Sequence, residues 1–150
     1  LGAEYLAALR RRCNETGTIL IFDEVQRGMG RTGLPFAANL YGVQPDMLTT
    51  AKALGNGFPC AALLMTPRVA KAVKLDALGT TFGGGPMACA VIEAVIEALE
   101  SEQLLARVRR IRRLQRDFEA NLQSVAVMLE MIDEIERLRT ALHREGIAVT

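Results

Sequence analysis

Two residues with reactive side chains, Asp23 and Lys52, each stand at the end of a short apolar run. The runs cover residues 18–22 and 47–51, and they are apolar or β-branched and bounded by turn residues, which predicts strands. Ligands of α/β sheets bind at the carboxyl ends of strands, so we expect both side chains in one crevice. A lysine there can form a Schiff base with an aldehyde, and a carboxylate can keep a pyridine nitrogen protonated. Together they suit the cofactor pyridoxal phosphate (PLP).

The first run permits a second interpretation. Apolar residues followed by Asp23-Glu24 also describe a strand whose aspartate holds magnesium in a P-loop ATPase. That interpretation needs a G-x-x-x-x-G-K-[ST] loop, and the sequence from Leu1 to Thr150 contains none. A segment preceding Leu1 could carry such a loop, so the ATPase alternative stays open on these residues alone.

Composition indicates an ordinary globular protein. Half of the 150 residues are hydrophobic, 23% are charged, and the formal net charge is +1, which gives no field that favours nucleic acid or a membrane surface. No apolar run reaches the roughly 18 residues needed to span a bilayer. Cys13, Cys60 and Cys89 are far apart and predict reduced thiols, so we expect a cytoplasmic location. His143 is the only histidine, which argues against a zinc site or a histidine-assisted nucleophile.

Arginines gather in one stretch, residues 107–116, that could be taken for an RNA contact. They alternate with apolar residues at helical spacing, and Asp117 and Glu119 follow them. This pattern is typical of a solvated helix face rather than a nucleic-acid interface.

Periodicity and turn residues predict alternating helices and strands around these motifs. A glycine-rich loop follows the first strand at residues 28–33, and Gly55-Asn56-Gly57 predicts a tight turn after Lys52. The expected helices are 3–14, 35–41, 67–74, a long stretch 87–124 that restarts near Ser101, and 133–145 closed by Gly146; the expected further strands are 61–65, 125–131 and 147–150.

Three motifs in register resemble one enzyme family. They are residues 23–33 (Asp-Glu-Val-Gln-Arg-Gly-Met-Gly-Arg-Thr-Gly), Pro45-Asp46, and residues 52–57 (Lys-Ala-Leu-Gly-Asn-Gly), and residues 80–84 add a later signature. Together they closely resemble the class III PLP-dependent aminotransferases, most of all the acetylornithine and ornithine aminotransferase group. The resemblance runs in register from about Tyr5 to Ile111.

The resemblance implies a role for five side chains. Lys52 would hold PLP as a Schiff base and then act as general base and acid, and Asp23 would pair with the ring nitrogen. Val25 would pack against the ring face, and Gln26 would donate a hydrogen bond to the ring's phenolic oxygen. Thr81 would reach the phosphate of PLP bound in the neighbouring subunit, which implies a homodimer.

The fold that the resemblance implies is α/β, of the fold-type I PLP-dependent transferases. Residues 1–100 would form the C-terminal half of the PLP-binding large domain, and residues 101–150 a connecting helix and part of a small α/β domain. We expect a fragment of a longer enzyme, inactive alone, that transfers an amino group from an amino acid to a 2-oxo acid such as 2-oxoglutarate. A class III aminomutase or decarboxylase, and a non-catalytic remnant, remain alternatives. The residues do not identify the amino donor.

Overall fold

A computed structural model of the chain describes residues 2–74, 77, 79–81 and 83–144. The chain divides into two compact units, Leu1–Val108 and Arg109–Thr150. The domain boundary at residue 100 that we expect from the sequence concerns the fold of a longer enzyme, and it stays a prediction.

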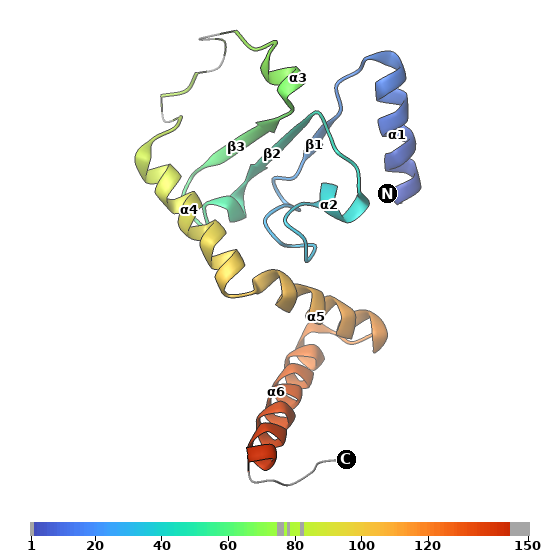
Figure 1. Cartoon of the computed structure of the whole chain (residues 1–150), viewed down its shortest axis with the longest axis vertical. Helices are drawn as coiled ribbons and strands as arrows, with labels where there is room; N and C mark the ends of the chain where they lie inside the picture. The colour runs from blue at the N-terminus through green and yellow to red at the C-terminus, as the bar shows by residue number, and fades with distance from the viewer. Residues whose placement is uncertain (1, 75–76, 78, 82, 145–150) are drawn as a thin grey trace. The chain divides into compact units, whose positions relative to one another are not determined.

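The first unit contains a three-stranded sheet with the strand order β1-β2-β3 (Figure 1). The strands are β1 (Ile21–Asp23), β2 (Met47–Ala51) and β3 (Ala61–Met65). β1 runs parallel to β2, whereas β3 runs antiparallel to β2. Because β1 and β2 are parallel neighbours, the residues that follow them emerge at the same edge of the sheet.

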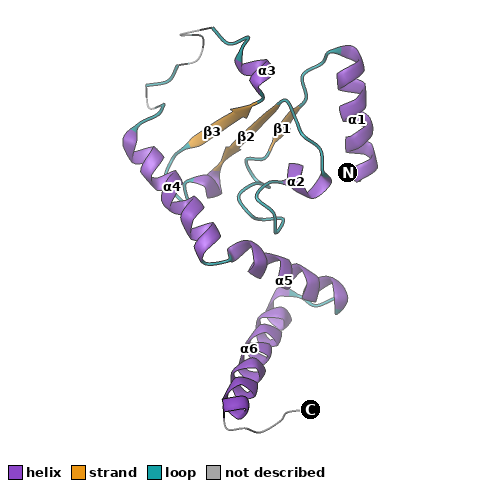
Figure 2. Cartoon of the chain, viewed as in Figure 1, coloured by secondary structure: helices purple, strands orange, loops and turns teal. Residues whose placement is uncertain are grey.

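Helices connect and flank the strands (Figure 2). α1 ends at Gly17, whose left-handed φ of 69° suits glycine, and Pro86 opens α4 at a position where its missing N–H costs nothing. Gln103, with φ 52°, separates α4 from α5 close to the restart that we expect near Ser101. The helices are α1 (Ala3–Thr16), α2 (Ala37–Tyr41), the 3-10 turn η1 (Lys52–Leu54), α3 (Pro67–Ala70), α4 (Pro86–Ser101), α5 (Leu104–Asp117) and α6 (Leu122–Arg144).

The predicted strands 47–51 and 61–65 have the predicted bounds, but the first strand is shorter than we expect. Pairing begins at Ile21 rather than Thr18, because the backbone N–H of Leu20 donates to the Asp46 carboxylate (2.9 Å) instead of to a strand. The predicted helix 67–74 also ends early, at Ala70.

The core of the first unit lies between α1 and the sheet. Leu6 and Cys13 from α1 pack with Leu20, just before β1, and with Val43, shortly after α2. Half-buried side chains complete this cluster, among them Phe22 of β1. Burial of these apolar side chains holds α1 beside β1.

Asp46, immediately before β2, ties four elements together at the end of β2 remote from Lys52. It accepts hydrogen bonds from Arg10 of α1 (2.7 Å), from Arg68 of α3 (2.7 Å) and from the N–H of Leu20 (2.9 Å). The Leu20 N–H first, and then Arg10 and Arg68, hold the pKa of the Asp46 carboxyl well below its usual range. This buried carboxylate is a structural node.

The second unit contains the end of α5 and the long helix α6. Arg110 of α5 pairs with Asp133 (3.1 Å) and Glu136 (3.6 Å) of α6. The arginine-rich stretch thus lies on a helix and takes part in ion pairs there. Its spacing predicts such a helix. The expected strand at residues 125–131 is wrong, because these residues lie within α6. Asn121 caps that helix by accepting the N–H of Ser124 (2.9 Å).

The expected final strand 147–150 and the helix end at Gly146 lie outside the described residues. Along α6, large apolar side chains are exposed at Val127, Met131, Ile135 and Leu138. Among the described residues, no helix combines the length and the apolar character that a membrane crossing requires.

Candidate functional site

Asp23 is the last residue of β1, and two donors hold its carboxylate. Its Oδ1 accepts the N–H of Val25 (3.0 Å) and the hydroxyl of Thr49 on β2 (3.2 Å). Asp23 stands opposite Thr49 in the parallel register, so both side chains lie on one face of the sheet. The Asp23 side chain is exposed, and its Oδ2 accepts no hydrogen bond from the described residues. One carboxylate oxygen is therefore fixed, and the other can accept a bond from a ligand.

Lys52 directly follows β2 and begins the 3-10 turn η1. Its φ of 51° lies in the left-handed region, which costs a lysine about 1–2 kcal/mol relative to a helical or extended backbone. The turn holds this conformation, since the N–H of Gly55 donates to the carbonyl of Lys52 (3.1 Å). A strained reactive residue at a strand end is typical of a functional position.

Asp23 and Lys52 lie at the carboxyl ends of adjacent parallel strands. Asp23 stands opposite Thr49, and Lys52 is three residues further along β2, so their backbones are offset by roughly 10 Å along the strand direction. The two side chains line separate hollows of the described residues. The structure brings the pair to one edge of the sheet without direct contact between them, and the single crevice that we expect for both side chains stays a prediction.

For the other predicted cofactor residues, Val25, Gln26 and Thr81, the structure gives less information on a cofactor site. Val25 is half-buried in the turn after β1, and Gln26 beside it is exposed. No hydrogen bond of the Gln26 side chain occurs among the described residues. Thr81 lies in an exposed turn distant in sequence, and no described contact links it to Asp23 or Lys52. The roles expected for these three residues stay predictions.

Glu24 has a separate role that the sequence pattern does not indicate. It is 2% exposed, and its two carboxylate oxygens accept the N–H groups of Ala37 (2.9 Å) and Ala38 (2.7 Å) at the start of α2. A carboxylate at a helix N-terminus is favourable for the exposed amides and for the helix dipole. Because strand side chains alternate, the period of two already separates Glu24 from Asp23.

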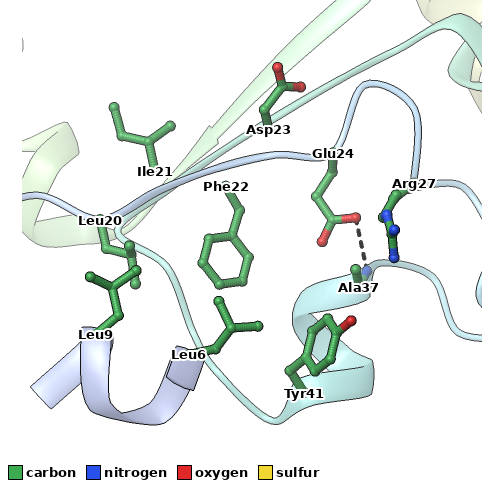
Figure 3. Close-up of a pocket in the computed structure, with 10 residues that line it drawn as sticks. All are labelled: Leu6, Leu9, Leu20, Ile21, Phe22, Asp23, Glu24, Arg27, Ala37 and Tyr41. Atoms are coloured by element: carbon green, nitrogen blue, oxygen red, sulfur yellow. Dashed lines mark hydrogen bonds between the residues drawn. The ribbon is translucent and has the colours of Figure 1, made fainter. Parts of the chain in front are cut away.

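Figure 3 shows this alternation along β1. Ile21 and Asp23 point to one side of the strand, and Phe22 and Glu24 point to the other. A hollow of about 410 Å³, lined mainly by apolar side chains, borders β1, and residues of both sides of the strand contribute to its lining. Glu24 is buried and bonded to α2, whereas Asp23 is exposed and has one oxygen available to a ligand.

Metal binding finds no support in the described part of the chain, where no three histidine, cysteine or acidic residues cluster closely enough to hold an ion. The carboxylate of Glu24 is also committed to the amides of α2. The magnesium-binding interpretation of Asp23-Glu24 thus lacks a ligand set among these residues.

Comparison with known proteins identifies relatives over most of the chain. Residues 2–142 match the family model described as "Aminotransferase class-III". Acetylornithine aminotransferase 1 of Pseudomonas syringae pv. tomato is 44% identical over 135 residues, which cover 90% of this chain and 33% of that protein. The chain thus spans about a third of the length of this curated relative.

Solved structures agree with the sequence relatives. The acetylornithine aminotransferase from Elizabethkingia anophelis superposes with a TM-score of 0.71 and 35% identity, over 77% of this chain and 30% of that one. The taurine:2-oxoglutarate aminotransferase from Bifidobacterium kashiwanohense, solved in complex with PLP and glutamate, gives a TM-score of 0.67 and 28% identity, over 77% of this chain and 26% of that one. The α/β fold of this chain, with its mixed parallel and antiparallel sheet, is therefore part of a fold-type I transferase.

Proposed function

Because this chain belongs to the class III aminotransferase family, we propose that it forms the Schiff-base segment of a PLP-dependent aminotransferase. The enzyme is of the acetylornithine/ornithine type and transfers an amino group to a 2-oxo acid such as 2-oxoglutarate. It works within a chain of the relatives' full length, as a cytoplasmic homodimer. The observation that carries the proposal is the placement of Asp23 and Lys52 at the ends of adjacent parallel strands.

The residues present fit PLP. A lysine with no hydrogen bond or ion pair among the described residues borders an open hollow of about 500 Å³, which is enough for a cofactor ring and a small substrate. A carboxylate with one uncommitted oxygen stands at the neighbouring strand end. When bound, PLP supplies an aldehyde that accepts the amino group and a ring that takes up negative charge.

Lys52, Asp23 and Thr49 each have a defined task in this proposal. Lys52 Nζ would hold PLP through the cofactor's aldehyde carbon, and as a free amine it would carry a proton from the substrate's α-carbon to that carbon. Asp23 keeps the ring nitrogen protonated through its free Oδ2. Thr49 restrains that carboxylate by donating to Oδ1, so that Oδ2 keeps its direction.

Three further side chains of this chain contribute to the proposed cofactor site. Val25 packs on the ring face, and Gln26 donates to the phenolic oxygen. Thr81 binds the phosphate in the neighbouring subunit. The family supports these tasks, and the half-buried position of Val25 agrees with a packing role.

A trapping experiment tests the proposal. The full-length protein is incubated with PLP, reduced with borohydride, digested, and searched for the modified lysine by peptide mass spectrometry. We expect the label on Lys52, its loss in Lys52→Ala, and no loss in the matched variants Lys71→Ala and Lys74→Ala, whose lysines are also exposed. A label that persists in Lys52→Ala at unchanged yield contradicts the proposal.

A further inference from the structure

The hollow at Lys52 is positively charged. Its lining includes the cations Arg31 and Lys52, the polar Asn56 and Cys60, and the apolar Phe58 and Pro59, and no acidic residue of the described part of the chain lines it. Two cations without a counter-ion beside a hydrocarbon wall favour an organic anion over a neutral ligand. Arg31 comes from the glycine-rich loop after β1, to which the proposed function assigns no task.

Neither cation has a partner among the residues that the structure describes. Arg31 is exposed and makes no hydrogen bond or ion pair with the described residues, and the same holds for Lys52. Arg68 provides the contrast within the same unit, because its guanidinium donates to Asp46 at 2.7 Å. The guanidinium of Arg31 is thus free to bind a ligand.

The loop that carries Arg31 is held in one shape. The N–H of Gly33 donates to the carbonyl of Gly30 (2.8 Å), and the N–H of Gly30 donates to the carbonyl of Pro35 (3.2 Å). Gly30 has φ 86°, and a Cβ there would lie 2.7 Å from the Leu105 side chain, so the loop packs closely against α5. Arg31 therefore extends from a fixed base, which reduces the entropy lost when it binds an anion.

We propose that Arg31 is the oxyanion-binding residue of the Lys52 hollow, and that it binds the carboxylate or phosphate group of the molecule that reacts at Lys52. This inference rests on the proposed function. Lys52 must be an uncharged amine to attack an aldehyde, so it cannot also supply the permanent charge that an anion requires. Arginine stays charged at any working pH, and its planar fork binds two oxygens at once.

Calorimetric titration of the full-length, cofactor-free protein tests the inference with two probes. Glutarate presents a carboxylate without an amine or oxo group, and inorganic phosphate presents the other oxyanion. We expect Arg31→Gln to weaken the binding of at least one probe by about 10- to 100-fold. Arg31→Lys keeps the charge without the fork and gives a smaller loss, and Arg112→Gln, an exposed arginine of α5, leaves both affinities unchanged.

The probe affected identifies the source of the oxyanion. A loss confined to glutarate assigns Arg31 to a substrate carboxylate, and a loss confined to phosphate assigns it to a cofactor phosphate. The inference is overturned if Arg31→Gln binds both probes as the unchanged protein does, or if Arg112→Gln loses as much. Borohydride trapping of PLP on Lys52 is measured in parallel: its absence from the unchanged protein refutes the proposed function, whereas the titration alone decides on Arg31.

Discussion

Replacement of Asp46 by asparagine tests whether one buried carboxylate holds the sheet in place. Asp46→Asn keeps the size of the side chain and one neutral acceptor oxygen, but it removes the charge that faces Arg10 and Arg68. The Asp46 side chain is 9% exposed and that of Arg10 is 17% exposed, whereas that of Arg68 is 60% exposed. The Leu20 and Arg10 bonds therefore dominate the effect.

The magnitude follows from these exposures. A hydrogen bond to a charged group with little solvent contact contributes about 1.5–3 kcal/mol, and an exposed ion pair such as that with Arg68 contributes less than about 1 kcal/mol. Asparagine keeps part of the bond to Leu20. We expect Asp46→Asn to lower the free energy of unfolding by about 2–3 kcal/mol, measured by urea denaturation with an unchanged m-value. Asp133→Asn, whose partner Arg110 is more exposed than Arg10, serves as the control and costs less than about 0.5 kcal/mol.

The pH dependence gives an independent check. The pKa of Asp46 is lowered in the folded state, so its contribution is fully present above the pKa of an unfolded aspartate, about 3.9, and is lost as the pH falls below that value. The deficit of Asp46→Asn is therefore largest near neutral pH and shrinks between about pH 4 and pH 2. A deficit equal to that of Asp133→Asn, or one that stays constant down to pH 2, would falsify the reasoning.

Four further substitutions have outcomes that the geometry fixes, each measured as a change in the free energy of unfolding. Gly55→Ala places a Cβ 2.3 Å from the carbonyl oxygen of Phe58 and costs about 2 kcal/mol or more, whereas Gly2→Ala meets nothing within 4 Å and serves as its control. Thr50→Val removes a buried hydroxyl that has no partner among the described residues and stabilises the protein by up to about 1 kcal/mol; a loss instead would show that the hydroxyl is bonded. Glu24→Gln turns an amide NH₂ toward the N–H groups of α2 and costs about 1–2 kcal/mol, and no cost would mean that the carboxylate does not cap that helix. Lys52→Gly is more stable than Lys52→Ala by about 1 kcal/mol because glycine accepts φ 51° without strain, and equal stabilities would contradict that strain.

Sequence patterns predict the local elements best where the chain's own turn residues bound them. β2 and β3 have the expected limits because Asp46 precedes one and Thr66 follows the other, outside short β-prone runs. β1 begins later than its pattern suggests, since the Leu20 N–H has a distant partner in Asp46. No local pattern signals a bond between residues 26 positions apart.

α6 shows the ambiguity of a short apolar run. Residues 125–131 contain β-prone valines and predict a strand, but Val127, Met131, Ile135 and Leu138 recur every four or three residues over more than one turn. Asn121 also provides the N-terminal cap. A longer window would have favoured the helix, because a strand does not keep that period.

The candidate site also has features that the sequence predicts and features that it does not. The adjacency of Asp23 and Lys52 is predictable, since it needs only two parallel strands and the rule that ligands bind at their carboxyl ends. The left-handed backbone of Lys52 and the free guanidinium of Arg31 are not predictable, because each depends on how a loop closes on itself. Loop closure is set by a few glycine contacts that leave little trace in composition.

The alternation of side chains along β1 and β2 places the residues proposed to bind a ligand and the buried structural residues on opposite faces of the sheet. Asp23 and Thr49 share the accessible face, where the Thr49 hydroxyl fixes one carboxylate oxygen of Asp23. Their successors Glu24 and Thr50 turn to the other face, and each is 2% exposed. A slip of one residue between the strands would remove Thr49 from Asp23 and bring a buried position opposite it. The contacts of Asp46 with α1, α3 and Leu20 oppose that slip, so the structural node at one end of β2 sets the register of the reactive residues at the other.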